Sequence, residues 1–396
     1  MIYADNAATT KVCDAAIEAM TACMRDGYGN PSSLYSFAQD AKEVLEGARK
    51  TIADCLCCDP KEITFTSCGT EADNQAVATA AKIGKKAGKM HIISTAFEHH
   101  AILHTLKRYE SEGFEVTLLD VAPTGVISVD QVADAIREDT CLVTIMFANN
   151  EIGTIQPIAE IGALCKERGV LFHTDAVQAA GHIPIDVKAQ NIDMLSISAH
   201  KFHGPKGVGV LYARKGIVLA NLLEGGAQER NKRPGTENVP GILGMATALK
   251  IACDGLEESS AKVTALRDRL IAGLDKIPYS ELNGDPFKRL PGNVSFCFEG
   301  IEGESLLLLL DAKGICASSG SACTSGSLDP SHVLLAIGRP HEVAHGSLRL
   351  SIGDDLTEED IDYMIESVAE VVDRLRSMSP FWRDMVEGKR EHVFAD

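Results

Sequence analysis

Two polar side chains stand at the ends of runs that are typical of buried strands. Lys201 comes just after Met194 to Ser198, and Asp175 ends the run that begins at Leu171. Burial disfavours the charge of a lysine at such a place, and a neutral lysine amine is the nucleophile of Schiff-base chemistry. Alternatively, Lys201 reaches solvent from the strand end. The lysine segment alone fits both interpretations.

The two side chains together favour a cofactor. In an open parallel sheet, ligands bind outside the carboxyl ends of the strands, so Lys201 and Asp175 are expected at one edge, on neighbouring strands. A simple ion pair would explain that placement. Pyridoxal phosphate, however, needs both residue types, because a lysine holds it as a Schiff base and an acid keeps its ring nitrogen protonated. The pair therefore indicates pyridoxal phosphate.

A phosphate site is expected nearby. Ser67-Cys68-Gly69-Thr70 links a predicted strand at 63–66 to an Ala-rich helix, expected from about Glu71 to Lys82. Small residues at a helix start expose backbone N–H groups, and the helix dipole favours an anion there. Thr70 adds a hydroxyl donor. Taken alone, Gly69 and Thr70 also fit an ordinary helix N-cap.

A thiol stands in a run of small residues, Ala317 to Ser327. This run is too small and flexible to pack a core, and it carries Cys323. Such residues are typical of a mobile loop, and a thiol attacks best as thiolate. The alternative is a surface cysteine on an ordinary loop.

The remaining pattern predicts the elements that position these groups. Short apolar runs alternate with helical stretches, which favours a largely parallel sheet with right-handed crossovers and helices on both faces. Strands are expected at 63–66, 91–94, 116–119, 142–147, 171–174, 194–198 and 208–212, and helices at 71–82 and 101–112. Beyond about residue 256 a smaller α+β part is expected, with helices at 257–274 and 358–376, a strand at 347–352, and a strand at 293–298 with one solvated face.

Composition excludes several classes of function. The chain has 396 residues and a net charge of −18, so it should repel nucleic acid and anionic membranes. No basic and apolar leader follows Met1, and the longest Leu run is too short to span a bilayer, so we expect a cytoplasmic protein. The 12 cysteines lack the spacing of a disulfide framework, and we expect reduced thiols, most of them buried.

The cluster Cys55-x-Cys57-Cys58 suggests a metal site. No second Cys pair and no suitably spaced His follows it to complete one. We therefore expect plain cysteines at a helix end and no metal. A thiol-rich metal or redox module built on this cluster is an alternative function, which the Lys201 and Asp175 pair disfavours.

Several motifs in order identify a resemblance over nearly the whole chain. The chain resembles the NifS/IscS-type cysteine desulfurases of the aspartate-aminotransferase fold (PLP fold type I), with the closest similarity to NifS. The matching segments are Tyr3 to Thr10, Gly29 to Ser33, Thr66 to Glu71, Glu98 to Ala101, Asn149 to Thr154, His173 to Gln178, Ser198 to Lys201, Arg233 to Thr236 and Ser318 to Cys323.

The resemblance implies an α/β fold with a large and a small domain. The large domain, 15–255, would hold a mostly parallel seven-stranded sheet. The small α+β domain, 1–14 with 256–396, would carry the Cys323 loop. A homodimer with shared active sites is also implied.

The resemblance further implies a role for each site residue. The predicted cofactor-binding residues are Lys201, Asp175, Gln178, Gly69, Thr70, His99, Asn150, Ser198, His200 and Thr236, the last reaching the phosphate in the neighbouring subunit. Asp175 would pair with the ring nitrogen, Gln178 would donate to the ring oxygen, and His99 would stack on the ring. Asn150 and Arg349 would hold the substrate carboxylate. A histidine before a helix also fits an N-cap or a core role for His99, and His100 is interpreted as structural.

The implied activity is that of a transferase that removes sulfur from L-cysteine. Lys201, His99 and Cys323 would be catalytic: Lys201 moves the Cα proton, and Cys323 attacks the substrate sulfur, keeps it as a persulfide and releases L-alanine. A NifU/IscU-type scaffold for iron–sulfur cluster assembly would accept the sulfur. The alternative is a selenocysteine lyase or cysteine desulfhydrase that releases its product freely.

Two positions depart from the family pattern. Ala7 stands where a relative often has Asn or Ser, which alters the polarity expected of the pocket. Gly353-Asp354-Asp355 replaces a stretch that usually carries an Arg, so a basic contact is not expected there.

Overall fold

The computed structural model describes residues 1–319 and 330–394. Its central sheet has seven strands in the order β2-β8-β7-β6-β5-β3-β4. Their bounds are β2 Ile63–Thr66, β3 His91–Thr95, β4 Glu115–Leu119, β5 Thr140–Thr144, β6 Leu171–Asp175, β7 Met194–Ser198 and β8 Gly209–Ala213. Only β8 runs against its neighbours in this sheet. The prediction of a mostly parallel sheet is confirmed.

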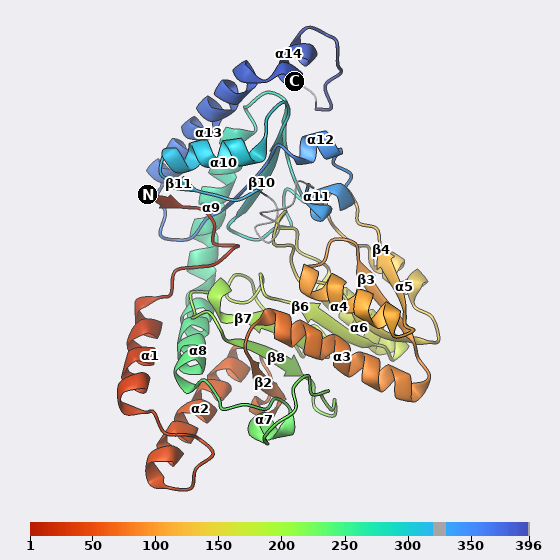
Figure 1. The fold of residues 1–396 in the computed structure, drawn as a ribbon, viewed down its shortest axis with the longest axis vertical. Helices are drawn as coiled ribbons and strands as arrows, with labels where there is room; N and C mark the ends of the chain where they lie inside the picture. The colour runs from red at the N-terminus through yellow and green to blue at the C-terminus, as the bar shows by residue number, and fades with distance from the viewer. Residues whose placement is uncertain (320–329, 395–396) are drawn as a thin grey trace.

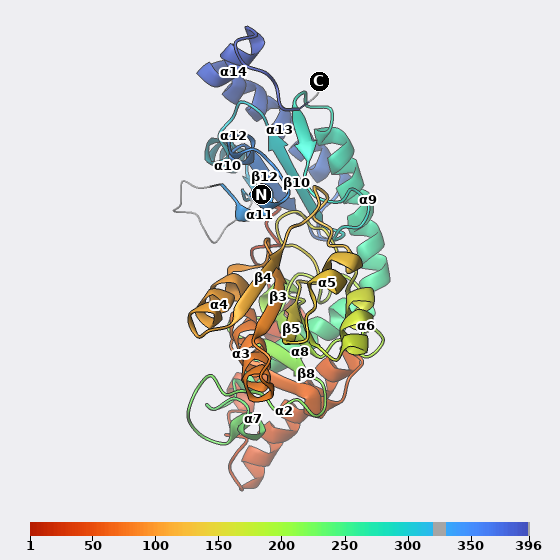
Figure 2. The same cartoon turned by 90° about the vertical axis from the view of Figure 1, so that its right-hand side faces the viewer.

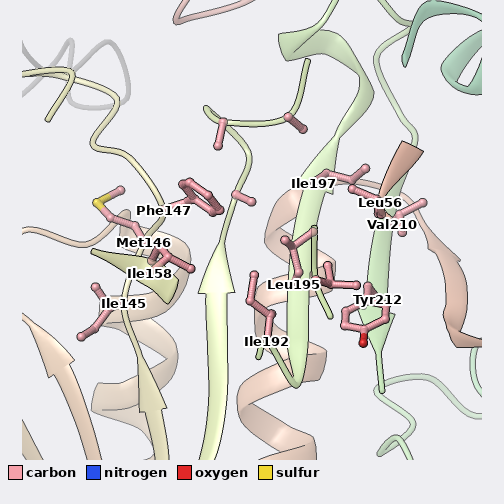
Figure 3. Packing of buried hydrophobic residues seen from close by; sticks show 14 of the residues in the cluster. Leu56, Ile145, Met146, Phe147, Ile158, Ile192, Leu195, Ile197, Val210 and Tyr212 are labelled. Atoms are coloured by element: carbon pink, nitrogen blue, oxygen red, sulfur yellow. The ribbon is translucent and has the colours of Figure 1, made fainter. Parts of the chain in front are cut away.

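Helices cover both faces of this sheet (Figure 1). On one face, α3 (Gly69–Ala87) contributes mostly alanine side chains, and α4 (His100–Ser111) contributes larger apolar ones, to a core that contains Ile92, Leu142 and Met194. The opposite face packs against α2 (Ser36–Cys55), α6 (Ile158–Arg168) and α8 (Val239–Asp254). Figure 3 shows part of that core, where Leu195 and Ile197 of β7 lie beside Tyr212 and Val210 of β8, their register partners.

Two elements differ from their predicted lengths. The helix after the phosphate motif continues past Lys82 to Ala87. It ends there because Gly88 adopts the left-handed conformation (φ 71°). The strand predicted at 142–147 ends at Thr144. The chain beyond it stays bonded to β6, since the N–H groups of Ile145 and Phe147 donate to carbonyl oxygens of that strand, at 3.2 and 2.8 Å. On the other side, the Met146 N–H donates to the side chain of Glu98, at 2.9 Å, instead of to a neighbouring strand.

A second sheet has the order β12-β10-β9, with β9 Ser280–Leu282, β10 Asn293–Phe298 and β12 Ser347–Ser351. It shares a separate core with α9 (Leu256–Leu274), α10 (Gly303–Ala312) and α13 (Glu358–Met378) (Figure 2). The prediction that β10 has one solvated face is wrong, because all six of its residues are buried. Its second face is covered from the large sheet's side, where Asn293 Nδ2 donates to the Glu151 carbonyl.

The remaining elements are short or peripheral. They are β1 Ile2–Tyr3, α1 Asp14–Asp26, η1 Pro60–Glu62, α5 Val129–Ala135, η2 Ala199–Lys201, α7 Gln228–Asn231, β11 Ile315–Cys316, α11 His332–Ala336, α12 His341–Ala344 and α14 Pro380–Val386. Among the described residues no single helix is long and apolar enough to cross a membrane. The pair α8 and α9 meets that test only when joined, and it is bent by 73°.

The N-terminal segment connects the two sheets (Figure 1). β1 pairs in parallel with β11, and the Asn6 N–H donates to Ser351 O of β12 at 3.1 Å. A few residues later, the Thr10 N–H donates to His200 O at 2.9 Å, next to β7. This segment therefore connects the two cores at a position next to Lys201.

Candidate active site

Polar side chains replace apolar ones toward the carboxyl ends of the central strands, on the face that α3 covers. Because side chains alternate along a strand, His173 and Asp175 of β6 point to the same face, together with Ser196 of β7. Asp175 is the register partner of Ser196. His173 shares hydrogen bonds with Thr144 Oγ1 (2.8 Å) and Ser196 Oγ (3.0 Å). This row of buried polar groups ends at Asp175.

Asp175 is a buried carboxylate with 6% exposure. Its Oδ1 accepts the Val177 N–H at 2.9 Å. Burial raises the pKa of Asp175 to about 6, while the Val177 N–H and the nearby Lys201 charge oppose that shift. A protonated ring nitrogen beside this carboxyl would favour its ionised form in the same way as Lys201 does.

Lys201 lies in the single turn η2, directly after β7, the strand next to β6. Its Nζ donates to the carbonyl oxygens of Ala7 (2.5 Å) and Ala8 (2.9 Å) in the N-terminal segment. The lysine and Asp175 are thus at neighbouring strand ends. The Lys201 side chain is half-buried, and the backbone carbonyls of the N-terminal segment fix the orientation of its amine.

The start of α3 lies against the same strand ends. Its N-cap residue, Cys68, makes no side-chain capping hydrogen bond, so the first N–H groups of this 19-residue helix are not capped by it. A Cβ atom at Gly69 would lie 2.7 Å from Val177 Cγ2 and 3.5 Å from Ser198 Cβ. Only glycine therefore allows the helix start to approach this close, with Ser198 beneath it and Thr70 exposed.

His200 and Gln178 face the N-terminal segment. His200 Nδ1 shares a 3.2 Å hydrogen bond with Thr9 Oγ1, and burial lowers the pKa of His200 to about 4. Gln178 Nε2 donates to Ala7 O at 2.9 Å. The Ala7 carbonyl oxygen therefore accepts hydrogen bonds from both Gln178 and Lys201. Because this role uses the backbone alone, it does not require a polar side chain at position 7.

His99 is the N-cap of α4, because its Nδ1 accepts the Ala101 N–H at 3.1 Å. Burial lowers the pKa of His99 to about 4, with Lys201 contributing. A neutral imidazole that accepts through Nδ1 carries its hydrogen on Nε2. The ring of His100, by contrast, lies against His104 and His332, at centroid distances of 5.0 and 4.7 Å.

Arg349 lies on β12 and is buried, with 2% side-chain exposure. It pairs with Asp5 at 2.9 Å and donates to Asn150 O at 3.2 Å. The structure therefore brings Arg349 and Asn150 together, although they are 199 residues apart. Sequence reasoning missed Asp5, since nothing local links it to an arginine more than 300 residues away.

The structure leaves two predicted site residues untested. Cys323 lies outside the described residues. Thr236 is exposed, in the segment that follows α7. Before Thr236, Glu229, Arg230 and Asn231 all have positive φ. The buried Glu229 carboxylate holds this strained turn, since it accepts two hydrogen bonds from the Arg49 guanidinium, at 2.6 and 2.8 Å.

These groups fit pyridoxal phosphate. Asp175 offers an acid for the ring nitrogen, and Lys201 offers an amine at the adjoining strand end. The glycine-lined start of α3 leaves N–H groups for a phosphate, with Ser198 close by. Among the described residues, no group of three His, Cys, Asp or Glu side chains is arranged to hold a metal ion.

Asp73 is a second buried carboxyl that sequence reasoning missed. It lies on α3 with 1% exposure, and its Oδ1 is 3.7 Å from His173 Nε2. Burial raises the pKa of Asp73 well above its usual value, and the charge of Asp175 adds to this. Burial also lowers the pKa of His173 to about 3. Burial therefore favours the neutral form of both groups.

We expect Asp73→Asn to stabilise the protein more as the pH rises. A carboxyl whose folded pKa exceeds its unfolded value stabilises the fold at acid pH, and this contribution is lost as the pH rises through the folded pKa. Asparagine has the same shape and does not titrate. The melting temperature of the variant minus that of the wild type should therefore increase from about pH 5 to about pH 8, above the unfolded pKa of Asp. A difference that is independent of pH would contradict a neutral Asp73.

Comparisons with known proteins agree with this site. The aminotransferase class-V family matches residues 2–364. The chain is 57% identical to "Cysteine desulfurase IscS" of Methanosarcina thermophila, over 96% of this chain and 94% of that protein. It is 53% identical to "Cysteine desulfurase IscS" of Clostridium botulinum (strain Hall), over 98% and 99%. A solved "NIFS-LIKE PROTEIN" superimposes with a TM-score of 0.89 at 40% identity, over 94% and 100% of the two chains.

Proposed function

The chain belongs to the aminotransferase class-V family and is a pyridoxal-phosphate-dependent cysteine desulfurase, and we propose that it retains the sulfur as a persulfide on Cys323. The observation that carries the site assignment is the meeting of Asp175 and Lys201 at neighbouring strand ends, beside the glycine at the start of α3. This geometry provides an acid for the ring nitrogen of the cofactor, an amine for its Schiff base and N–H groups for its phosphate.

The cofactor supplies an electrophilic carbon and an electron sink when bound. Asp175 would hold its ring nitrogen, and Gly69, Thr70, Ser198 and His200 would hold its phosphate. Lys201 Nζ would hold the cofactor as a Schiff base, and the same amine would then move the Cα proton of the substrate. His99, neutral and with its hydrogen on Nε2, serves as a hydrogen-bond donor to the ring side of the pocket.

Substrate orientation falls to Arg349 and Asn150. A guanidinium binds a carboxylate through two parallel hydrogen bonds, which fixes the amino acid in one pose. Asp5 already neutralises Arg349 in this structure. The ion pair with Asp5 therefore lowers the free-energy cost of burying the Arg349 guanidinium before the substrate binds. The carboxylate of L-cysteine then competes with Asp5 for this guanidinium.

Cys323 completes the reaction. Its thiolate attacks the sulfur of the bound L-cysteine, a sulfur–sulfur bond forms, and the carbon–sulfur bond breaks. The electron pair of that bond stays with the substrate Cβ, which takes up a proton and becomes the methyl group of alanine. Alanine leaves, and the persulfide remains on the protein. We propose a NifU/IscU-type scaffold for iron–sulfur clusters as the acceptor, in keeping with the family resemblance.

We further propose a cytoplasmic homodimer. The segment before α7 exposes Val218 (76%) and Leu223 (48%), apolar groups suited to a subunit contact, and Thr236 follows the same helix. Thr236 would then reach the phosphate in the other subunit. The 11 described cysteines are all free thiols, which favours a reducing compartment.

The test is turnover of L-cysteine labelled with ³⁵S by the holoenzyme. We expect alanine and protein-bound label to form in equal amounts in the first turnover. After alkylation and digestion, the label should map to the peptide that contains Cys323, and it should pass to an added scaffold protein. Free labelled sulfide with no bound label would instead identify a desulfhydrase, and label on another peptide would exclude Cys323 as the carrier.

A further inference from the structure

The cysteines outside the active site are more accessible than the sequence suggested. The expectation that most would be buried is wrong, because only four of the 11 described cysteines are. The cluster Cys55, Cys57 and Cys58 follows α2, and each of the three is at least partly accessible. The structure adds a partner from a distant part of the chain. Cys253, near the end of α8, packs with Cys55 against the same core.

Cys55 and Cys253 line one cavity. Its volume is about 200 Å³, and its other walls include the apolar side chains of Ile183, Ile185 and Leu249. A water molecule needs about 30 Å³, so the cavity admits a small oxidant. Each thiol belongs to the last turn of its helix, where the backbone can shift more easily than within the helix.

The two thiols influence each other's acidity. The contact with Cys55 lowers the pKa of Cys253, whereas the same contact and burial raise the pKa of Cys55. Cys253 is therefore the more acidic thiol of the pair. Burial raises the pKa of the neighbouring Cys58 to about 12, which leaves that thiol unreactive. Two neighbouring thiols of unequal acidity provide an attacking and a resolving sulfur.

We propose that Cys55 and Cys253 are an oxidisable dithiol that a peroxide converts to a disulfide. The Cys253 thiolate attacks one peroxide oxygen, an S–O bond forms, and the O–O bond breaks. The hydroxide that leaves takes a proton from solvent and becomes water. The Cys55 sulfur then attacks the Cys253 sulfur, an S–S bond forms, and the oxygen leaves as a second water with the Cys55 proton. The thiols lose two electrons, and the peroxide gains them.

The position of this pair links it to the arrangement of the two sheets. Cys253 is two residues from Gly255, which is both the C-cap of α8 and the N-cap of α9. The two helices meet there at 73°, and they connect the two hydrophobic cores. A disulfide would tie the end of α2 to this junction. It would restrain the bend and leave every active-site side chain untouched.

Peptide mapping of peroxide-treated holoenzyme tests the proposal. After alkylation of the remaining thiols, we expect a crosslinked peptide pair that contains Cys55 and Cys253. Cys58→Ser is the matched control and should give the same crosslink. In Cys55→Ser, Cys253 should stop at the sulfenic acid, which dimedone traps. A Cys253 that is still alkylated after oxidation, or a crosslink from Cys55 to Cys57 or Cys58, would overturn the proposal.

A second measurement does not depend on the variants. Iodoacetamide should modify Cys253 in the untreated wild-type holoenzyme at a lower pH than it modifies Cys58, because only the thiolate reacts. The opposite order would contradict the assignment of Cys253 as the attacking sulfur. Neither readout involves cysteine turnover, so failure of this proposal and failure of the desulfurase mechanism can be told apart.

Discussion

Lys201→Ala is expected to reduce alanine formation from L-cysteine by about 10²–10⁴-fold, the contribution of one positioned acid–base group. Two separate tasks depend on this amine: covalent attachment of the cofactor and movement of the Cα proton. Its Nζ is held by the carbonyls of Ala7 and Ala8, a position that the shorter alanine side chain leaves vacant. The measurement is alanine release under saturating cofactor.

The same variant should also lose the covalent cofactor. Borohydride reduction followed by intact mass analysis should show a retained cofactor on the wild type and none on Lys201→Ala. Lys206→Ala is the matched control, since Lys206 is an exposed lysine five residues away and should behave as the wild type. A small primary amine added to Lys201→Ala should restore part of the proton transfer. Retention of full activity by Lys201→Ala would exclude the lysine as the catalytic base.

Asp175→Asn is expected to cost about 3–5 kcal/mol of catalysis, or roughly 10²–10⁴-fold in rate, because it leaves a buried cationic ring nitrogen without its counter-charge. Asparagine preserves the shape and the contact with the Val177 N–H only in part, and it cannot hold a proton on the ring. The measurement is alanine release together with a pH titration of the cofactor's absorption. We expect the ring to lose its proton at a lower pH in the variant.

Asp73→Asn supplies the control for this result. Asp73 is a second buried carboxyl near the same strand end, but it is neutral, so its replacement should leave the titration of the cofactor unchanged. If both variants shifted the titration equally, the effect would come from general disturbance of the strand ends. If neither did, Asp175 would not be the partner of the ring nitrogen.

Local patterns predicted the parts of the site that lie on single strands. Lys201 and Asp175 were found because each follows an apolar strand with a polar group, a signal contained in a few neighbouring residues. Their meeting at one edge then follows from parallel pairing. Gly69 was found in the same way, from a strand, a glycine and a helix in sequence. These inferences need no knowledge of the distant parts of the chain.

Contacts between distant segments were not predictable from the same patterns. The ion pair of Asp5 with Arg349 joins residues 344 positions apart, and the contact of Asp73 with His173 joins a helix to a strand through the core. The second buried face of β10 was missed for the same reason. Alternation within a strand reports which residues are polar, but it cannot show that a polar face meets another sheet, as Asn293 does here.

The cysteine pair shows the same limit. Cys55 was noticed because of its neighbours Cys57 and Cys58, which favoured a metal site as the alternative to plain cysteines. Its actual neighbour is Cys253, almost 200 residues later, which packing of α2 against α8 brings beside it. Sequence spacing thus drew attention to Cys57 and Cys58, whereas the partner on which the proposed thiol oxidation depends lies in another helix.

The N-terminal segment imposes an order on biosynthesis. Residues 2–10 are synthesised before both sheets, yet Asn6 donates to Ser351 O, 345 residues further along. At about 5–20 residues per second, this partner is synthesised roughly 20–70 s later. Until then the segment that carries Ala7 and Ala8 is held only by its contacts with the first sheet. The complete arrangement around Lys201 therefore forms only after Ser351 has been synthesised, and a chain that stalls before that residue lacks it, however well its first sheet has folded.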